Sequence, residues 1–128
     1  MKRFFKSLAY ALSGIRAAFK SEQIFRIHTI AMVIAVAMGL YLELSLAAWG
    51  FVLFSIGFVL VAELFNTAIE RLGDEAADGK QKLMIKHAKD ASAAAVLISA
   101  LTALVIGILF LLIPFAQRML DLIQYHIV

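Results

Sequence analysis

The chain has 128 residues, enough for one domain, and 63% of them are apolar, against about 45 to 50% in soluble domains. This composition excludes an ordinary soluble protein and predicts an integral membrane protein. The chain contains no cysteine, which excludes disulfides and thiolate metal sites. We expect no nucleic acid partner.

Residues 1–24 are predicted to form an amphipathic helix on the membrane surface. Lysines and arginines that can reach phosphate headgroups lie between apolar residues at helical spacing, which are Phe4, Leu8, Ala11, Leu12, Ile15 and Phe19. Near its end, Glu22 stands four residues before Arg26, a spacing that permits an ion pair.

Three segments are predicted to cross the membrane as helices: residues 27–42, 44–64 and 91–117. Each holds a run without Asp, Glu, Lys or Arg, and the run 44–62 alone nearly spans a hydrocarbon core of about 30 Å. His28 stands at the entry of the first span, where a single histidine is more often a hydrogen-bonded polar residue than a ligand.

The basic residues predict the orientation. Six lysines and arginines precede the first span, five lie between the second and third, and only Arg118 follows the last. By the positive-inside rule, the N-terminus and the loop predicted over residues 71–88 face the cytoplasm. Any reaction with a cytoplasmic co-substrate is therefore expected on that side.

Polar residues follow the second apolar run on one predicted helix face. Glu63, Asn66 and Glu70 stand at positions i, i+3 and i+7, and Asp74 extends the face if the helix continues past Gly73. Glu70 and Asp74, taken alone, are typical of charges beyond the membrane edge. Glu63 borders the apolar run directly, and acids in that position usually have a function, such as that of a general base.

The stretch "HAKDASAAAV" contains Lys89 and Asp90 where the polar loop meets the third span. Taken alone, it is typical of an interfacial anchor followed by small residues that allow close helix packing.

The motifs "AELFNTAIE" and "AKDASAAAV", on a chain of this length with three spans, resemble the small prokaryotic diacylglycerol kinase family. The resemblance implies an all-α homotrimeric bundle in the bacterial inner membrane, with three transmembrane helices and a surface helix per subunit. It also implies transfer of the γ-phosphoryl group of MgATP to a membrane lipid alcohol. The stretches "RFFKS", "EQIFRIH" and "LELSLAAW" resemble the undecaprenol kinase branch, so undecaprenol is expected ahead of diacylglycerol.

The resemblance also assigns roles to residues. It makes Glu63 the general base and Asn66 an orienting group beside it, and it gives the Mg²⁺ ion to Glu22 and Glu70. The remaining assignments are ATP contacts at Arg3, Tyr10, Lys89 and Asp90, and lipid contacts at Arg16 and Phe19. The family's Glu-Tyr-His element is replaced in the polar loop by "DGKQKLM", which leaves Lys80 or Lys82 as a substitute ATP contact.

Two other classes of function remain open from the residues alone. A non-enzymatic scaffold could use the acids to bind a basic partner. A pore or transporter is less favoured, because the first and third spans contain no interior acid or base for a conduction path.

Overall fold

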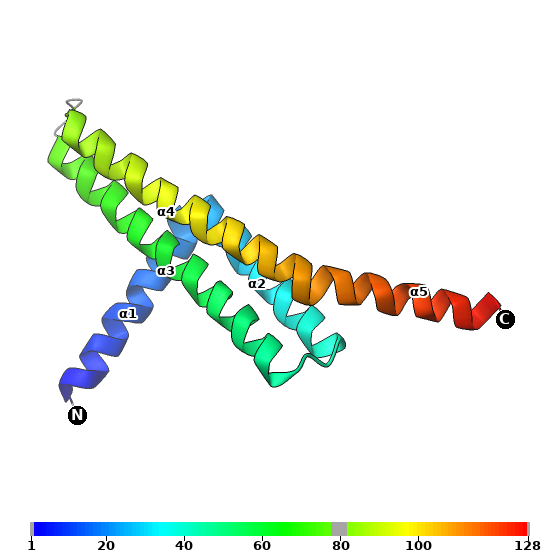
Figure 1. The fold of residues 1–128 in the computed structure, drawn as a ribbon. Helices are drawn as coiled ribbons and strands as arrows, with labels where there is room; N and C mark the ends of the chain where they lie inside the picture. The colour runs from blue at the N-terminus through cyan, green and yellow to red at the C-terminus, as the bar shows by residue number, and fades with distance from the viewer. Residues whose placement is uncertain (1, 78–81, 128) are drawn as a thin grey trace.

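A computed structural model describes residues 2–77 and 82–127, and every regular element in these ranges is helical (Figure 1). The elements are α1 (Lys2–Ser21), α2 (Gln23–Tyr41), α3 (Leu46–Ala77), α4 (Leu83–Gly107), the π-helical segment η1 (Ile108–Leu112) and α5 (Ile113–Ile127). Three helical stretches are long and apolar enough to cross a membrane: Gln23–Tyr41, Leu46–Ala77 and Leu83–Tyr125. These observations confirm the predicted all-α membrane fold with three spans and an N-terminal helix.

Helices α3 and α4 form an antiparallel hairpin and lie side by side along most of α3 (Figure 1). Helix α2 flanks the hairpin near the end where α3 begins. Helix α1 leaves the bundle near the middle of α3, and its N-terminal end points away from the hairpin. The hairpin is therefore the main packed unit of the chain.

Helix α3 is longer than a membrane requires. Its 32 residues extend over about 48 Å at about 1.5 Å per residue, whereas the hydrocarbon core is about 30 Å thick. About 20 residues counted from Leu46 cover that thickness, so the core ends close to residue 65. Glu63 thus lies at the membrane edge, and the rest of α3 continues beyond it.

The loop predicted over residues 71–88 is shorter in the structure. Helix α3 continues to Ala77 and α4 begins at Leu83, while residues 78–81, including Lys80, lie outside the described ranges. Gly73 lies within the helix and does not end it, and it is a site of close packing between α3 and α4. A Cβ atom there would lie 3.1 Å from Ile85 Cγ2 and 3.3 Å from Lys89 Cδ of α4. Asp74 therefore extends the face of Glu63, Asn66 and Glu70.

The N-terminal helix also ends earlier than the predicted residue 24. Helix α1 ends at Ser21, and Glu22 has an extended backbone with φ −100° and ψ 115°. The chain changes direction there, because an extended residue interrupts the helical hydrogen bonds. Helix α2 then begins at Gln23, so His28 lies in its second turn.

A tight turn joins α2 to α3. Glu43 adopts a positive φ of 53°, and the Ser45 hydroxyl accepts a hydrogen bond from the Ala48 amide at 3.3 Å. Gly39 lies directly against Trp49, since a Cβ atom there would approach the ring to 2.8 Å. Close contact at this glycine fixes the end of α2 on the start of α3.

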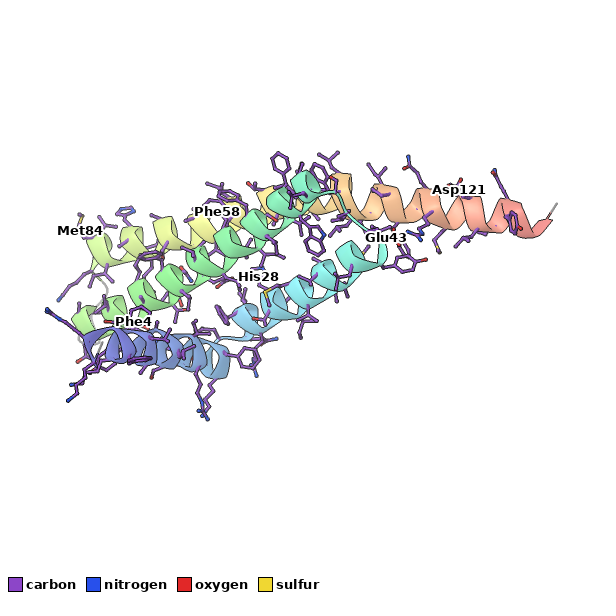
Figure 2. All side chains as sticks on the ribbon, turned by 90° about the horizontal axis from the view of Figure 1, so that it is seen from below. Phe4, His28, Glu43, Phe58, Met84 and Asp121 are labelled. Atoms are coloured by element: carbon purple, nitrogen blue, oxygen red, sulfur yellow. The ribbon has the colours of Figure 1, made fainter. Side chains whose placement is uncertain are left out.

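The third long helix continues past the others as α5, on which Figure 2 labels Asp121. Pro114 cannot donate a backbone hydrogen bond, and η1 precedes it with an i to i−5 bond from the Ile113 amide to the Ile108 carbonyl. Arg118 of α5 donates to the Tyr41 carbonyl at 3.1 Å and lies 5.0 Å above the Tyr41 ring. This contact fastens α5 to the end of α2.

Candidate active site

The candidate site follows one face of α3, which we call the polar face and define by Glu63, Asn66, Glu70 and Asp74. One helix presents all four because they stand three or four residues apart. Each of the four contacts a side chain of another helix or of the same face. The polar face is where the membrane-spanning part of α3 gives way to the part beyond the membrane.

Glu63 is buried and lies against His28 of α2. Its side chain is 4% exposed and that of His28 is 22% exposed, and His28 Nδ1 approaches Glu63 Oε1 to 2.8 Å. The approach is off the hydrogen-bond line, so neither atom has an aligned hydrogen-bond partner among the described residues. Figure 2 labels His28 near the start of α2. His28 is therefore more than a separately satisfied polar residue, because it stands beside the predicted base.

Asn66 joins α3 to α4 and orients Glu70. Its Nδ2 donates to Glu70 Oε1 at 3.1 Å, and its Oδ1 accepts from the buried Ser92 hydroxyl at 2.7 Å. The same hydroxyl lies 2.8 Å from the Lys89 carbonyl, and its single proton can serve only one of the two acceptors at a time. The two side-chain contacts fix which end of the Asn66 amide faces which partner.

Lys89 pairs with Asp74 at the end of the polar face that is farthest along α3 from Glu63. Its Nζ lies 2.6 Å from Asp74 Oδ1. Both residues line an open recess of about 590 Å³ between the ends of α3 and α4, together with Ala77, Lys82, Leu83, Ile85, Lys86 and Asp90. Three lysines and two aspartates border this recess, so its lining is only weakly basic. Lys89 is paired with Asp74, and Lys82 is engaged with the Ala76 carbonyl at 2.7 Å.

Glu22 pairs with Arg71 of α3, and no ion pair joins it to Arg26 within the described ranges. The Arg71 guanidinium lies 3.6 Å from Glu22 Oε1 and donates to the Ser21 hydroxyl at 2.5 Å. Glu22 precedes α2 with extended backbone, so the two residues do not stand four apart within one helix, as the predicted pair requires. The contact instead connects the joint between α1 and α2 to α3, one residue after Glu70.

Glu22 and Glu70 offer carboxylate oxygens, the ligands that Mg²⁺ prefers. Among the residues that the structure describes, no group of three or more acids and histidines could hold a metal ion. Magnesium commonly binds one or two carboxylates together with substrate phosphates, so two carboxylates match the number and type of protein ligands that such an ion takes. The donor set is therefore compatible with a metal that arrives with a nucleotide.

The predicted contacts on α1 are not brought to the polar face within one chain. Arg3, Tyr10, Arg16 and Phe19 are all exposed on α1. The N-terminal end of α1, which carries Arg3, points away from the hairpin in Figure 1, and Tyr10 lies midway along the same helix. Arg16 and Phe19 belong to the end that is nearer to α3.

An apolar cavity of about 410 Å³ lies between α2, α3 and the α4–η1 helix. Among the described residues that line it, His28 and Ser55 carry polar side chains, and the others are apolar or glycine, including Met32, Val52 and Leu111. The Ser55 hydroxyl bonds to the Val52 carbonyl at 2.9 Å. The cavity therefore offers an apolar chain a place to lie, with His28 at its wall.

Sequence reasoning missed three residues of the site. From the sequence, His28 is a single histidine at a helix entry, Ser92 is one of several small packing residues, and Arg71 is one of the basic residues between the second and third spans. The sequence signal for these three site residues is their type and position: a histidine, a hydroxyl and a guanidinium near the same membrane edge as the acids. Which acid each would meet depends on how separate helices pack.

The chain is similar to known proteins over most of its length. Residues 9–111 match the family model described as prokaryotic diacylglycerol kinase. An undecaprenol kinase of Bacillus subtilis is 38% identical over 112 residues, which cover 88% of this chain and 90% of that protein. A diacylglycerol kinase of Synechocystis is 34% identical over 113 residues, 88% of this chain and 65% of that protein. A diacylglycerol kinase of Escherichia coli K12 is 31% identical over 103 residues, 80% and 84% of the two chains.

Proposed function

We propose that this chain, which belongs to the prokaryotic diacylglycerol kinase family and is therefore a lipid kinase, transfers the γ-phosphoryl group of ATP directly to a membrane lipid alcohol. The observation that carries the proposal is the buried Glu63, which lies at the membrane edge beside the wall of an apolar cavity. A lipid hydroxyl can reach such a carboxylate from within the membrane, while a nucleotide arrives from the aqueous side. Family membership favours this enzyme over the scaffold and the pore.

In this proposal Glu63 is the general base. It accepts the proton of the lipid hydroxyl while the hydroxyl oxygen bonds to the γ-phosphorus and the bond from that phosphorus to the β-phosphate oxygen breaks, releasing ADP. Phosphoryl transfer depends mainly on position and on neutralised charge, so one well-placed base is sufficient protein chemistry. Asn66 supports the reaction by orienting Glu70 through its 3.1 Å hydrogen bond.

Glu22 and Glu70 would hold a divalent metal, for which we propose Mg²⁺. When bound, the ion supplies positive charge that offsets the charge of the ATP phosphates. The protein's own contribution is to place one carboxylate on the α1–α2 joint and another on α3. Arg71 keeps the joint against α3 through its contacts with Glu22 and Ser21.

The nucleotide would lie against the recess at the ends of α3 and α4, contacting Lys89 and Asp90. The lysines of this recess, Lys82, Lys86 and Lys89, outnumber its aspartates, Asp74 and Asp90, and a triphosphate is strongly anionic. We further propose a homotrimer with the polar face toward the cytoplasm of a bacterial cell. Arg3 and Tyr10 would then reach the nucleotide from a neighbouring subunit, because the N-terminal end of α1 points away from the recess of its own chain.

The preferred lipid is undecaprenol, with diacylglycerol second. Its support is the higher identity to the Bacillus subtilis undecaprenol kinase, 38% against 34% and 31% for the two diacylglycerol kinases. The apolar chain of the lipid would occupy the cavity between α2, α3 and the α4–η1 helix. Arg16 and Phe19 would contact the lipid where it enters from the membrane surface.

The test is phosphoryl transfer in mixed detergent micelles. Purified protein is incubated with γ-labelled MgATP and either undecaprenol or diacylglycerol at equal mole fraction, with a lipid-free sample as control, and label in the lipid phase is followed. We expect faster labelling of undecaprenol. Faster labelling of diacylglycerol would reverse the lipid assignment, and no labelling of either would remove the proposed reaction for both lipids.

A further inference from the structure

His28 stands between two features that the reaction needs to bring together. Its imidazole lines the apolar cavity, and its Nδ1 lies 2.8 Å from Oε1 of the buried Glu63. Glu63 itself is not among the residues that line the cavity. The imidazole therefore borders both the space for the lipid chain and the carboxylate that would take the proton.

The Glu63 carboxylate depends on few neighbours for its orientation. At 4% side-chain exposure it is largely removed from water, and Oε1 has no aligned hydrogen bond among the described residues. A buried carboxylate without a partner is costly, so the nearest donor determines where its oxygens point. The nearest nitrogen is His28 Nδ1, which donates to Oε1 when it carries the ring proton. A hydrogen bond that is poorly aligned in an unliganded enzyme commonly tightens when substrate binds.

Other polar groups of the polar face are already occupied. Asn66 is held between Glu70 and Ser92, and Lys89 is paired with Asp74. Neither residue contacts Glu63 among the hydrogen bonds and ion pairs of the described residues. Among the described residues, this leaves the His28 side chain of α2 to hold the Glu63 carboxylate in position.

We propose that His28 is a positioning residue: its Nδ1–H holds Oε1 of Glu63 and thereby leaves Oε2 directed at the hydroxyl of a lipid in the cavity. This inference rests on the proposed function, because it assigns His28 a role in lipid phosphorylation. It also implies one tautomer, with the proton on Nδ1, since the carboxylate accepts it there. No bond to His28 is made or broken in the reaction.

Three substitutions test the proposal because they separate the two ring nitrogens. The amide nitrogen of His28→Asn can take the place of Nδ1, that of His28→Gln reaches the place of Nε2, and His28→Ala supplies neither. We expect His28→Ala to lower kcat for lipid phosphorylation by roughly 10- to 100-fold, which corresponds to the loss of a hydrogen bond to a charged group. The KM for ATP should stay within about twofold, since orienting the base does not bind nucleotide. His28→Asn should recover most of the lost kcat and His28→Gln should not.

Thr29→Ala is the matched control, because Thr29 is the next residue of α2 and its hydroxyl bonds only to the Phe25 carbonyl among the described contacts. It should leave kcat unchanged. Thermal unfolding of each variant identifies a loss of structure. If His28→Ala does not fold, the kcat values of His28→Asn and His28→Gln test the proposal by themselves. Equal kcat in wild type and His28→Ala, or recovery by Gln but not Asn, would overturn the inference while leaving the proposed function intact. No transfer by the wild type would remove the proposed function and this inference with it.

Discussion

The two halves of α3 differ in what they bury. The half that follows the turn from α2, residues 46–62, is called the outer half here after the proposed orientation. It buries Ala48, Val52, Ser55 and Val59, and the Ser55 hydroxyl bonds to the helix's own backbone. The inner half, residues 63–77, buries Glu63 and Thr67 and carries side chains that reach other elements. One continuous helix therefore has an outer half that packs by shape and an inner half that holds polar groups in fixed positions.

Because of this difference, substitutions in the two halves should affect stability and catalysis separately. The outer half contacts α2 and lines the cavity through apolar atoms, so changes there should alter folding and lipid binding more than the chemical step. The inner half holds polar groups whose hydrogen bonds are individually modest in free energy but which fix the reacting geometry. Substitutions in the inner half should thus lower activity more than stability, and substitutions in the outer half should lower stability more than the rate of the chemical step.

Of the three variants Glu70→Gln, Gly39→Ala and Ser92→Ala, we expect the largest effect for Glu70→Gln in the inner half. It removes the negative charge of a proposed Mg²⁺ ligand while keeping the shape and the proximity to Asn66. The Mg²⁺ concentration for half-maximal activity should rise roughly 10- to 100-fold, with thermal stability unchanged. Glu75→Gln, an exposed acid on the same helix, is the control and should leave it unaltered. An unchanged Mg²⁺ requirement in Glu70→Gln would contradict its role.

Gly39→Ala should have the next largest effect, and it should be on stability. The added Cβ would meet the Trp49 ring at 2.8 Å, so the start of α3 must shift away from α2. Overpacking of this kind costs about 1 to 3 kcal/mol, measurable as a lower unfolding midpoint in detergent. Gly57→Ala, where no atom lies within 4 Å of the new Cβ, is the matched control and should not be destabilised. Equal midpoints for the two variants would show that the Trp49 contact does not constrain the turn.

Ser92→Ala should have the smallest effect and act in the inner half. It removes the hydroxyl that donates to Asn66 Oδ1 at 2.7 Å, a bond worth about 0.5 to 1.5 kcal/mol. The expected result is a fall in kcat of a few-fold with little change in folding, measured by initial rates of lipid phosphorylation. Ser99→Ala is the control, since that buried hydroxyl bonds to the Val96 carbonyl of its own helix. Similar kcat values in Ser92→Ala and Ser99→Ala would show that the hydrogen bond from Ser92 to Asn66 does not contribute to catalysis.

The sequence predicts more of the fold than of the site. Uncharged runs mark the three membrane helices because the bilayer tolerates few charges, and the spacing of Glu63, Asn66 and Glu70 places them on one face whatever the packing. Gly73 was open to two interpretations, because a glycine can end a helix or allow close approach, and only the contact with Ile85 decides. The pairing of His28 with Glu63 depends on the position of α2 relative to α3, which no local pattern reports.

The most direct test of the central claim is to measure nucleotide binding and lipid phosphorylation on the same preparation of Glu63→Gln, beside the wild type. We predict that ATP binds both proteins with similar affinity, while the variant loses roughly 10²- to 10⁴-fold in kcat, the range expected for a general base. Phosphorylation at the wild-type rate by Glu63→Gln would contradict the account, since the inner half of α3 would then lack the base on which the proposed reaction depends.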